Sequence, residues 1–147
     1  MTWGWVTDVA IDRGGDGAAA DELAVRNVVG LMAQLADGPD VDAYVDLFTP
    51  DGSWEMPGAP RHGHDDIRAG SLARRAAGDI GPGSSTRHVV TILSVTVDGD
   101  VATADSVWQF FANTDTEPRV QLMGTYRDDL VRTPAGWKMA RRRITIG

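Results

Sequence analysis

Cysteine is absent from the sequence of 147 residues. Its absence excludes disulfide bonds, a thiolate nucleophile and thiolate metal ligands. Long apolar runs are also lacking. No segment is long enough to span a membrane, and residues 1–8 have neither the basic start nor the apolar core of a signal peptide. From these absences we expect a cytoplasmic protein without a membrane partner.

An excess of positive charge is lacking too. The formal net charge is −7 and the pI is about 4.7, whereas a protein that binds phosphate backbones needs a basic face. The one basic cluster, Arg141–Arg143, lies within an expected strand, so we expect no nucleic-acid partner. Hydrophobic residues make up 42% of the chain and charged residues 24%, which is typical of a folded globular domain.

The first half of the chain has the apolar spacing of helices. We predict three helices, with one short strand between the second and the third: 21–36, 40–48, 53–56 (the strand) and 65–77. Residues 1–18 are rich in turn sequences, which predicts a flexible N-terminal arm. Trp3 and Trp5 in this arm are expected to cover a cavity mouth or an oligomer contact.

In the second half the apolar period changes to two. This pattern predicts four long strands joined by short turns: 85–97, 101–112, 119–131 and 136–146. Helices followed by consecutive hairpin-linked strands indicate an α+β fold with a curved, mostly antiparallel sheet. We predict one such domain over residues 19–147.

Two polar residues stand out because their surroundings are apolar. Asp37 follows the first predicted helix, and His88 lies near the start of the first long strand. A carboxylate beside an imidazole fixes the imidazole tautomer and stabilises its protonated form, so such a pair is suited to proton transfer. Taken alone, each residue also fits a structural role, His88 in the core and Asp37 in a turn before Gly38.

Five phrases occur in a fixed order along the chain. They span 47–54 (LFTPDGSW), 63–67 (GHDDI), 86–88 (TRH), 124–128 (GTYRD) and 136–138 (GWK). Together they resemble the SnoaL-like branch of the nuclear-transport-factor-2-like superfamily. The resemblance implies a cone-shaped barrel in which the sheet wraps around three N-terminal helices and encloses a pocket. This superfamily hosts dehydratases, isomerases, cyclases, epoxide hydrolases and non-catalytic subunits, so the fold alone leaves the reaction open.

Asp37 and His88 match a catalytic pair found in one branch of this superfamily. Scytalone dehydratase, hexachlorocyclohexane dehydrochlorinase and bile-acid 7α-dehydratase share an Asp–His dyad at the end of the first helix and in the first long strand. The resemblance implies that His88 is a general base and that Asp37 orients it. Trp54 is similar to a tryptophan that lines the dehydrochlorinase pocket.

Other positions depart from the enzymes of the superfamily. The phrase that supplies the base of ketosteroid isomerase, Glu-Asp-Pro, reads Glu-Met-Pro at residues 55–57, so that base is missing. Two water-holding tyrosines of scytalone dehydratase are matched by Ala36 and Met56, and its second histidine by Gly124. The group that stabilises a developing anion therefore stays open. Strand alternation offers these candidates: Ser106, Trp108, Tyr126 and an arginine of 141–143, which would face inward as a counter-ion for Asp37 or for a substrate anion.

We predict a cofactor-independent lyase or isomerase, dehydratase-like, that acts on a hydrophobic cyclic small molecule of polyketide, steroid or terpenoid type. The predicted substrate-binding residues form an apolar set that suits a ring-containing ligand: Trp54, Met56, Trp108, Phe110 and Tyr126. The alternatives are a polyketide cyclase and a non-catalytic ligand-binding member of the same fold. An epoxide hydrolase built on Asp105 with Arg141 or Arg143 ranks lower, because no phrase matches it.

Neither a metal nor a cofactor is predicted. His62 and His64 precede a helix, where histidines are mostly solvated. A homodimer or homotrimer is expected, because strand alternation places an apolar row on the outer face of the sheet: Val89, Thr91, Leu93, Val95 and Val97.

Overall fold

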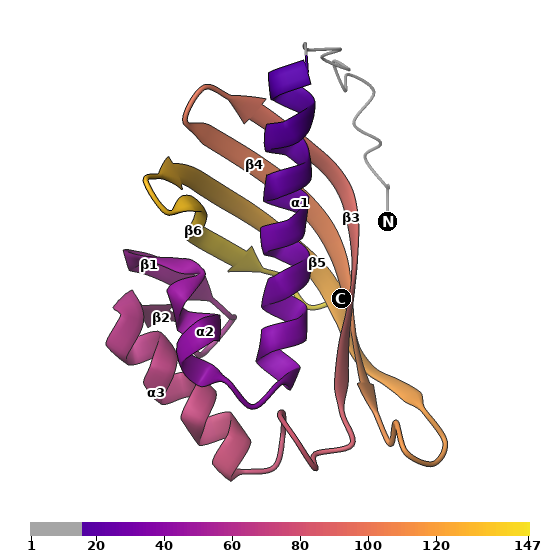
Figure 1. Ribbon diagram of the computed structural model, residues 1–147. Coiled ribbons are helices and arrows are strands. Elements are labelled where there is room, and N and C mark those ends of the chain that lie inside the picture. Colours follow the sequence, from indigo (N-terminus) through magenta and orange to yellow (C-terminus); the bar gives the residue numbers. More distant parts are fainter. Residues whose placement is uncertain (1–15) are drawn as a thin grey trace.

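The computed structural model describes residues 16–147, and the expectations about Trp3, Trp5 and the rest of residues 1–15 lie outside the described residues. Six strands form one curved sheet, with helix α1 lying across one of its faces (Figure 1). The helices are α1 (Asp16–Asp37), α2 (Val41–Asp46) and α3 (Gly63–Ala76). The strands are β1 (Phe48–Glu55), β2 (Arg61–His62), β3 (Arg87–Asp98), β4 (Val101–Ala112), β5 (Arg119–Thr133) and β6 (Gly136–Ile144).

The strand order in the sheet is β2-β1-β6-β5-β4-β3. All neighbours are antiparallel except β1 and β6, which are parallel. The predicted α+β class with a curved, mostly antiparallel sheet is therefore confirmed. Strand β2 was not predicted, because two residues that pair only with the end of β1 leave no periodic signal.

Helix α1 begins at Asp16, five residues before the predicted start at residue 21. Residues 16–18, which the sequence placed in the arm, therefore form its first turn. The alanines at 18–20 favour helix strongly, and turn chemistry in the preceding residues concealed that preference. Helix α3 also begins early, at Gly63 rather than at residue 65, and its N-cap residue is His62.

The core lies between α1 and the face of the sheet that it covers. Its buried side chains come from both halves of the chain, and the largest fully buried ones are Phe48, Met32, Leu130, Met139, Val25, Val29 and Val45. Burial of each such side chain contributes about 1.5–3 kcal/mol to stability. None of the described helices is long and apolar enough to cross a membrane.

A β-bulge in β3 corrects the predicted outer face of the sheet. The pairing with β4 shifts between Ile92 and Ser94, so the alternation of side chains changes at Leu93. As a result Val95 and Val97 pack against the core, although the sequence placed them outside. Val89 and Thr91 remain on the exposed face, as does Leu93, whose exposed fraction is 61%.

Residues 145–147 run beside β5, and their close approach to that strand requires a glycine at position 124. Beyond β6, Thr145 donates its backbone N–H to Thr125 and Gly147 donates its N–H to Met123. The two segments approach so closely at Gly124 that a Cβ there would overlap the carbonyl oxygen of Thr145. Only glycine allows this contact, which is a packing reason for the glycine at this position.

We expect Gly124→Ala to lower the free energy of unfolding by about 1–3 kcal/mol, because the backbone of the C-terminal segment must move to admit the methyl group. Gly30→Ala is the matched control. It lies within α1, a Cβ there would meet nothing within 4 Å, and alanine should be neutral or stabilising by up to about 1 kcal/mol. Urea unfolding measures both changes. Equal stability of the two variants would contradict the assigned contact.

The exposed face of the sheet carries an apolar patch, which we define as Val89, Leu93, Val120 and Met123. Pairing across β4 places Val89 and Met123 in one row, on either side of Gln109. This patch supports the expected homodimer or homotrimer, which stays a prediction. Leu93→Asp should lower the mass measured by light scattering, because it places a charge in the proposed contact. A wild-type protein that is monomeric at micromolar concentration would show the expectation to be wrong.

Candidate functional site

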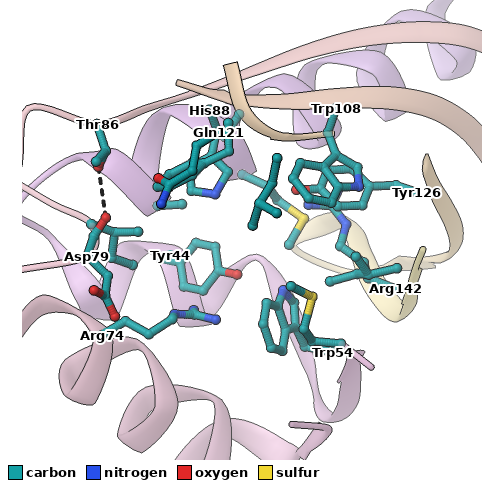
Figure 2. A pocket seen from close by; sticks show the side chains of 18 of the residues that line it. Tyr44, Trp54, Arg74, Asp79, Thr86, His88, Trp108, Gln121, Tyr126 and Arg142 are labelled. Carbon is teal, nitrogen blue, oxygen red and sulfur yellow. Dashed lines mark hydrogen bonds between the residues drawn. The ribbon is translucent and has the colours of Figure 1, made fainter. Parts of the chain in front are cut away.

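A cavity of about 430 Å³ lies between the helices and the covered face of the sheet (Figure 2). Its wall is mostly aromatic and aliphatic, with a few polar groups among them. A pocket of this size and lining suits a small ring-containing ligand.

Asp37 and His88 lie 51 residues apart in sequence and in direct contact in space. Asp37 is the last residue of α1, and His88 is the second residue of β3. One carboxylate oxygen, Oδ1, lies 2.7 Å from His88 Nδ1, and the other, Oδ2, accepts the backbone N–H of His88 at 2.8 Å. The structure thus brings together the two residues that the sequence singled out, although their catalytic role stays a prediction.

This contact fixes the chemistry of the imidazole ring. An ionised carboxylate can only accept, so Nδ1 must carry the shared proton and the neutral ring leaves Nε2 unprotonated. His88 lines the cavity, and its ring packs against Phe110 with centroids 4.8 Å apart. Both side chains of the pair are largely buried, with exposed fractions of 19% for His88 and 7% for Asp37. A ring held in this way can take a proton at Nε2 while Asp37 balances the resulting charge.

The five residues predicted to bind substrate all line the cavity: Trp54, Met56, Trp108, Phe110 and Tyr126. Trp108 and Tyr126 stack with centroids 5.7 Å apart and an interplanar angle of 14°. The Trp108 Nε1–H is buried and has no hydrogen-bond partner among the described residues. Ser106, another candidate, lies two residues before Trp108 on β4; it is buried but does not line the cavity.

The inward-facing arginine is Arg142, and its partner differs from the one expected. Its guanidinium donates to both oxygens of Asp128, at 2.8 and 2.7 Å, rather than to Asp37. Burial alone would lower the pKa of Arg142, but the adjacent Asp128 carboxylate holds it above its ordinary value. Arg142 also lies over the Tyr126 ring, 3.9 Å from its centroid. A charge neutralised in this way supports the cavity wall and is not a free counter-ion.

The other two arginines of the cluster face away from the cavity. Arg141 pairs with Glu55, and Arg143 pairs with Asp129. Asp105 pairs with Arg127 instead of either of them. The epoxide-hydrolase set considered from the sequence is therefore not assembled, because alternation on β6 carries these arginines to the opposite face of the sheet.

The sequence analysis named none of these five polar residues of the cavity as site residues: Tyr44, Arg74, Asp79, Thr86 and Gln121. Tyr44 shares the helical spacing of the apolar residues around it, so its hydroxyl group gave no separate signal of a site. Arg74 carried a usable signal, because it shares the helical spacing of the buried residues Ile67, Gly70 and Ser71 on α3. A cation on the buried stripe of a helix indicates a cavity or a buried partner.

No metal site is formed by the described part of the chain, where no group of three or more metal-ligating side chains was found. His62 is the N-cap residue of α3, and His64 Nε2 lies 3.0 Å from the Phe48 carbonyl oxygen. Both histidines therefore have local structural positions outside the cavity.

Comparison with known families classifies the fold. The family model described as a SnoaL-like domain matches residues 17–143. The chain belongs to the SnoaL-like domain family. This family includes polyketide cyclases, isomerases and dehydratases, and its members are often enzymes. A search of proteins with curated functions finds no match.

Solved structures with the same architecture agree with this assignment. An NTF2-like protein with a cystatin-like fold from Novosphingobium aromaticivorans is 28% identical, with a TM-score of 0.77, and the alignment covers 87% of this chain and 82% of that one. Rv3472 from Mycobacterium tuberculosis, a protein of unknown function, is 25% identical with a TM-score of 0.74, covering 85% and 75%. A Catenulispora acidiphila protein in complex with S-DNPA shares the fold at 22% identity, TM-score 0.68, covering 87% and 94%.

Both tyrosines of the chain line the cavity, and their titration tests how far they are shielded from water. Burial raises the pKa of Tyr126 to about 12 and also raises that of Tyr44. The pKa of Tyr126 is therefore higher in the folded protein than in the unfolded chain, where it is near 10. Its contribution to the free energy of unfolding is fully present below pH 10 and is lost as the pH rises toward about 12. Tyrosinate absorbance at 295 nm should therefore appear above pH 10, together with loss of ellipticity. Titration of either tyrosine near pH 10 in a folded protein would contradict the burial of these side chains.

Proposed function

We propose that this protein is a cofactor-independent lyase or isomerase in which His88 is the general base and Asp37 its orienting partner. The observation that carries the proposal is the position of His88: its Nδ1 is bound to Asp37 at 2.7 Å, and its ring lines an open cavity. A base in this position can remove a proton from a carbon or a hydroxyl group of a bound molecule. Its general-base assistance would be worth about 10²–10⁴-fold in rate.

The cavity supports a hydrophobic cyclic substrate. Stacked Trp108 and Tyr126 and the ring of Trp54 supply flat apolar surfaces, on which a polyketide-, steroid- or terpenoid-like ring packs well. Tyr126 stays protonated at neutral pH, since burial raises its pKa to about 12, and its hydroxyl group can donate a hydrogen bond to a developing oxyanion.

The proposed reaction is a dehydration of a cyclic β-hydroxy ketone. His88 Nε2 takes the proton from the carbon next to the carbonyl, the hydroxyl group leaves with a proton returned by the imidazolium, and the products are an enone and water. Removal and return of one proton leave the protein unchanged, so the step needs no oxidant, reductant or cofactor. The Asp37 carboxylate holds the ring in one orientation through both transfers.

The rival functions within this family predict different products. A polyketide cyclase would form a carbon–carbon bond in the substrate, so product connectivity distinguishes it from a dehydratase. A non-catalytic ligand-binding member would not need Asp37 and His88 within hydrogen-bond reach of each other, whereas Asp37 Oδ1 and His88 Nδ1 lie 2.7 Å apart. The last point favours the enzyme over the binding protein.

We expect His88→Gln to lower turnover of a bicyclic β-hydroxy ketone, whose dehydration gives a naphthol, by about 10²–10⁴-fold. Asp37→Asn should also lower kcat, because an amide no longer fixes the Nδ1–H tautomer. Naphthol absorbance measures the rate. His62→Gln is the matched control and should keep full activity, since His62 lies outside the cavity. Turnover by His88→Gln at the wild-type rate would overturn the assignment.

A further inference from the structure

Arg74 is a cation of the cavity that no carboxylate balances. Of the described residues, none accepts a hydrogen bond from its guanidinium or forms an ion pair with it, and its Nε is buried without a partner. This contrasts with Arg142, the other arginine of the cavity, which both oxygens of Asp128 neutralise. Asp79 also lines the cavity, but it lies outside ion-pair distance of Arg74.

The guanidinium of Arg74 is held in place by packing rather than by charge. Its central carbon lies 4.4 Å from the centroid of the Trp54 ring, a cation–π arrangement. Figure 2 shows the guanidinium beside Tyr44, whose hydroxyl group points into the cavity, with His88 on the opposite side. Tyr44 is buried, with an exposed fraction of 3%, and its hydroxyl has no protein partner among residues 16–147.

An unbalanced cation in an apolar pocket is costly unless something binds it. Burial lowers the pKa of Arg74, yet a guanidinium stays protonated in proteins at neutral pH. The free energy lost by leaving water is recovered when an anion contacts the charge, and the planar donor fork of arginine matches an oxyanion. A pocket that keeps such a group unpaired is prepared for an anionic ligand.

We propose that the cavity binds a cyclic organic acid whose carboxylate or enolate oxygens contact the Arg74 guanidinium and the Tyr44 hydroxyl. The ring of the ligand then lies along Trp54 and Trp108, and its far side faces His88. This inference names the substrate class for the proposed function. Binding of the acid itself does not require His88 to act as a base.

The test compares naphthoate with naphthamide, which have the same ring and nearly the same shape but differ in charge. Isothermal titration calorimetry gives the Kd of each compound for the wild type and the variants. We expect the wild type to bind naphthoate at least about tenfold more tightly, because a charge-assisted hydrogen bond is stronger than a neutral one. Arg74→Met should remove this preference and change naphthamide binding by less than about threefold.

Two further variants control for charge and folding. Arg68→Met removes a positive charge from the same helix outside this cavity, so it should keep the preference for naphthoate. Arg74→Lys keeps the charge but loses the planar fork, and it should keep part of the preference. Circular dichroism shows whether each variant is folded, and Arg74→Lys carries the test if Arg74→Met is not.

The outcomes separate this inference from the proposed function. Equal affinity of the wild type for the two compounds, a preference that survives in Arg74→Met, or no naphthoate binding at millimolar concentration would each overturn the anion site. His88→Gln should keep the preference for naphthoate. If that variant also kept full turnover, the general-base proposal would fail while the anion site stood.

Discussion

The contact between Asp37 and His88 is the interaction on which the site depends. One oxygen of the Asp37 carboxylate binds the His88 imidazole, and the other accepts the backbone N–H of His88. It thereby joins the end of α1 to the beginning of β3 and fixes both the position of the strand and the tautomer of the ring. A substitution at Asp37 removes both hydrogen bonds, whereas a substitution at His88 keeps the backbone N–H that donates to Asp37 Oδ2 and removes only the contact of the ring.

Charge is distributed unequally around the cavity. Asp37 is hydrogen-bonded to His88, and Asp128 is fully used by Arg142, so each carboxylate in these pairs has its partner. Arg74 alone of these charged groups is left for a ligand. Burying the Arg142–Asp128 pair costs desolvation free energy, so the pair adds little to stability. Removing one partner would nevertheless leave an uncompensated charge in the wall of the cavity. We infer that this pair maintains the shape of the cavity, while Arg74 and His88 act on what enters it.

The apolar side chains of the cavity belong to two clusters of buried residues. Met32 and Tyr44 are part of the main core, whereas Trp108, Tyr126 and Ile144 form a second buried cluster at the cavity. Because the aromatic rings of the second cluster are stacked on one another and on Arg142, they form a rigid wall. A rigid wall lowers the ordering cost of binding a flat ligand.

The sequence by itself determined the helical half, the four long strands, the α+β class and the identity of Asp37 and His88, because hydrophobic period and local phrases carry that information. It left out β2, whose two residues leave no periodic signal, and the bulge at Leu93, which shifts the alternation of side chains within one strand. It named the arginine cluster but not the partner of Arg142, and it overlooked Arg74 and Tyr44. Only the structure decided these points, because the partner of Arg142 depends on the register between β5 and β6, and the positions of Arg74 and Tyr44 depend on how the helices pack over the sheet.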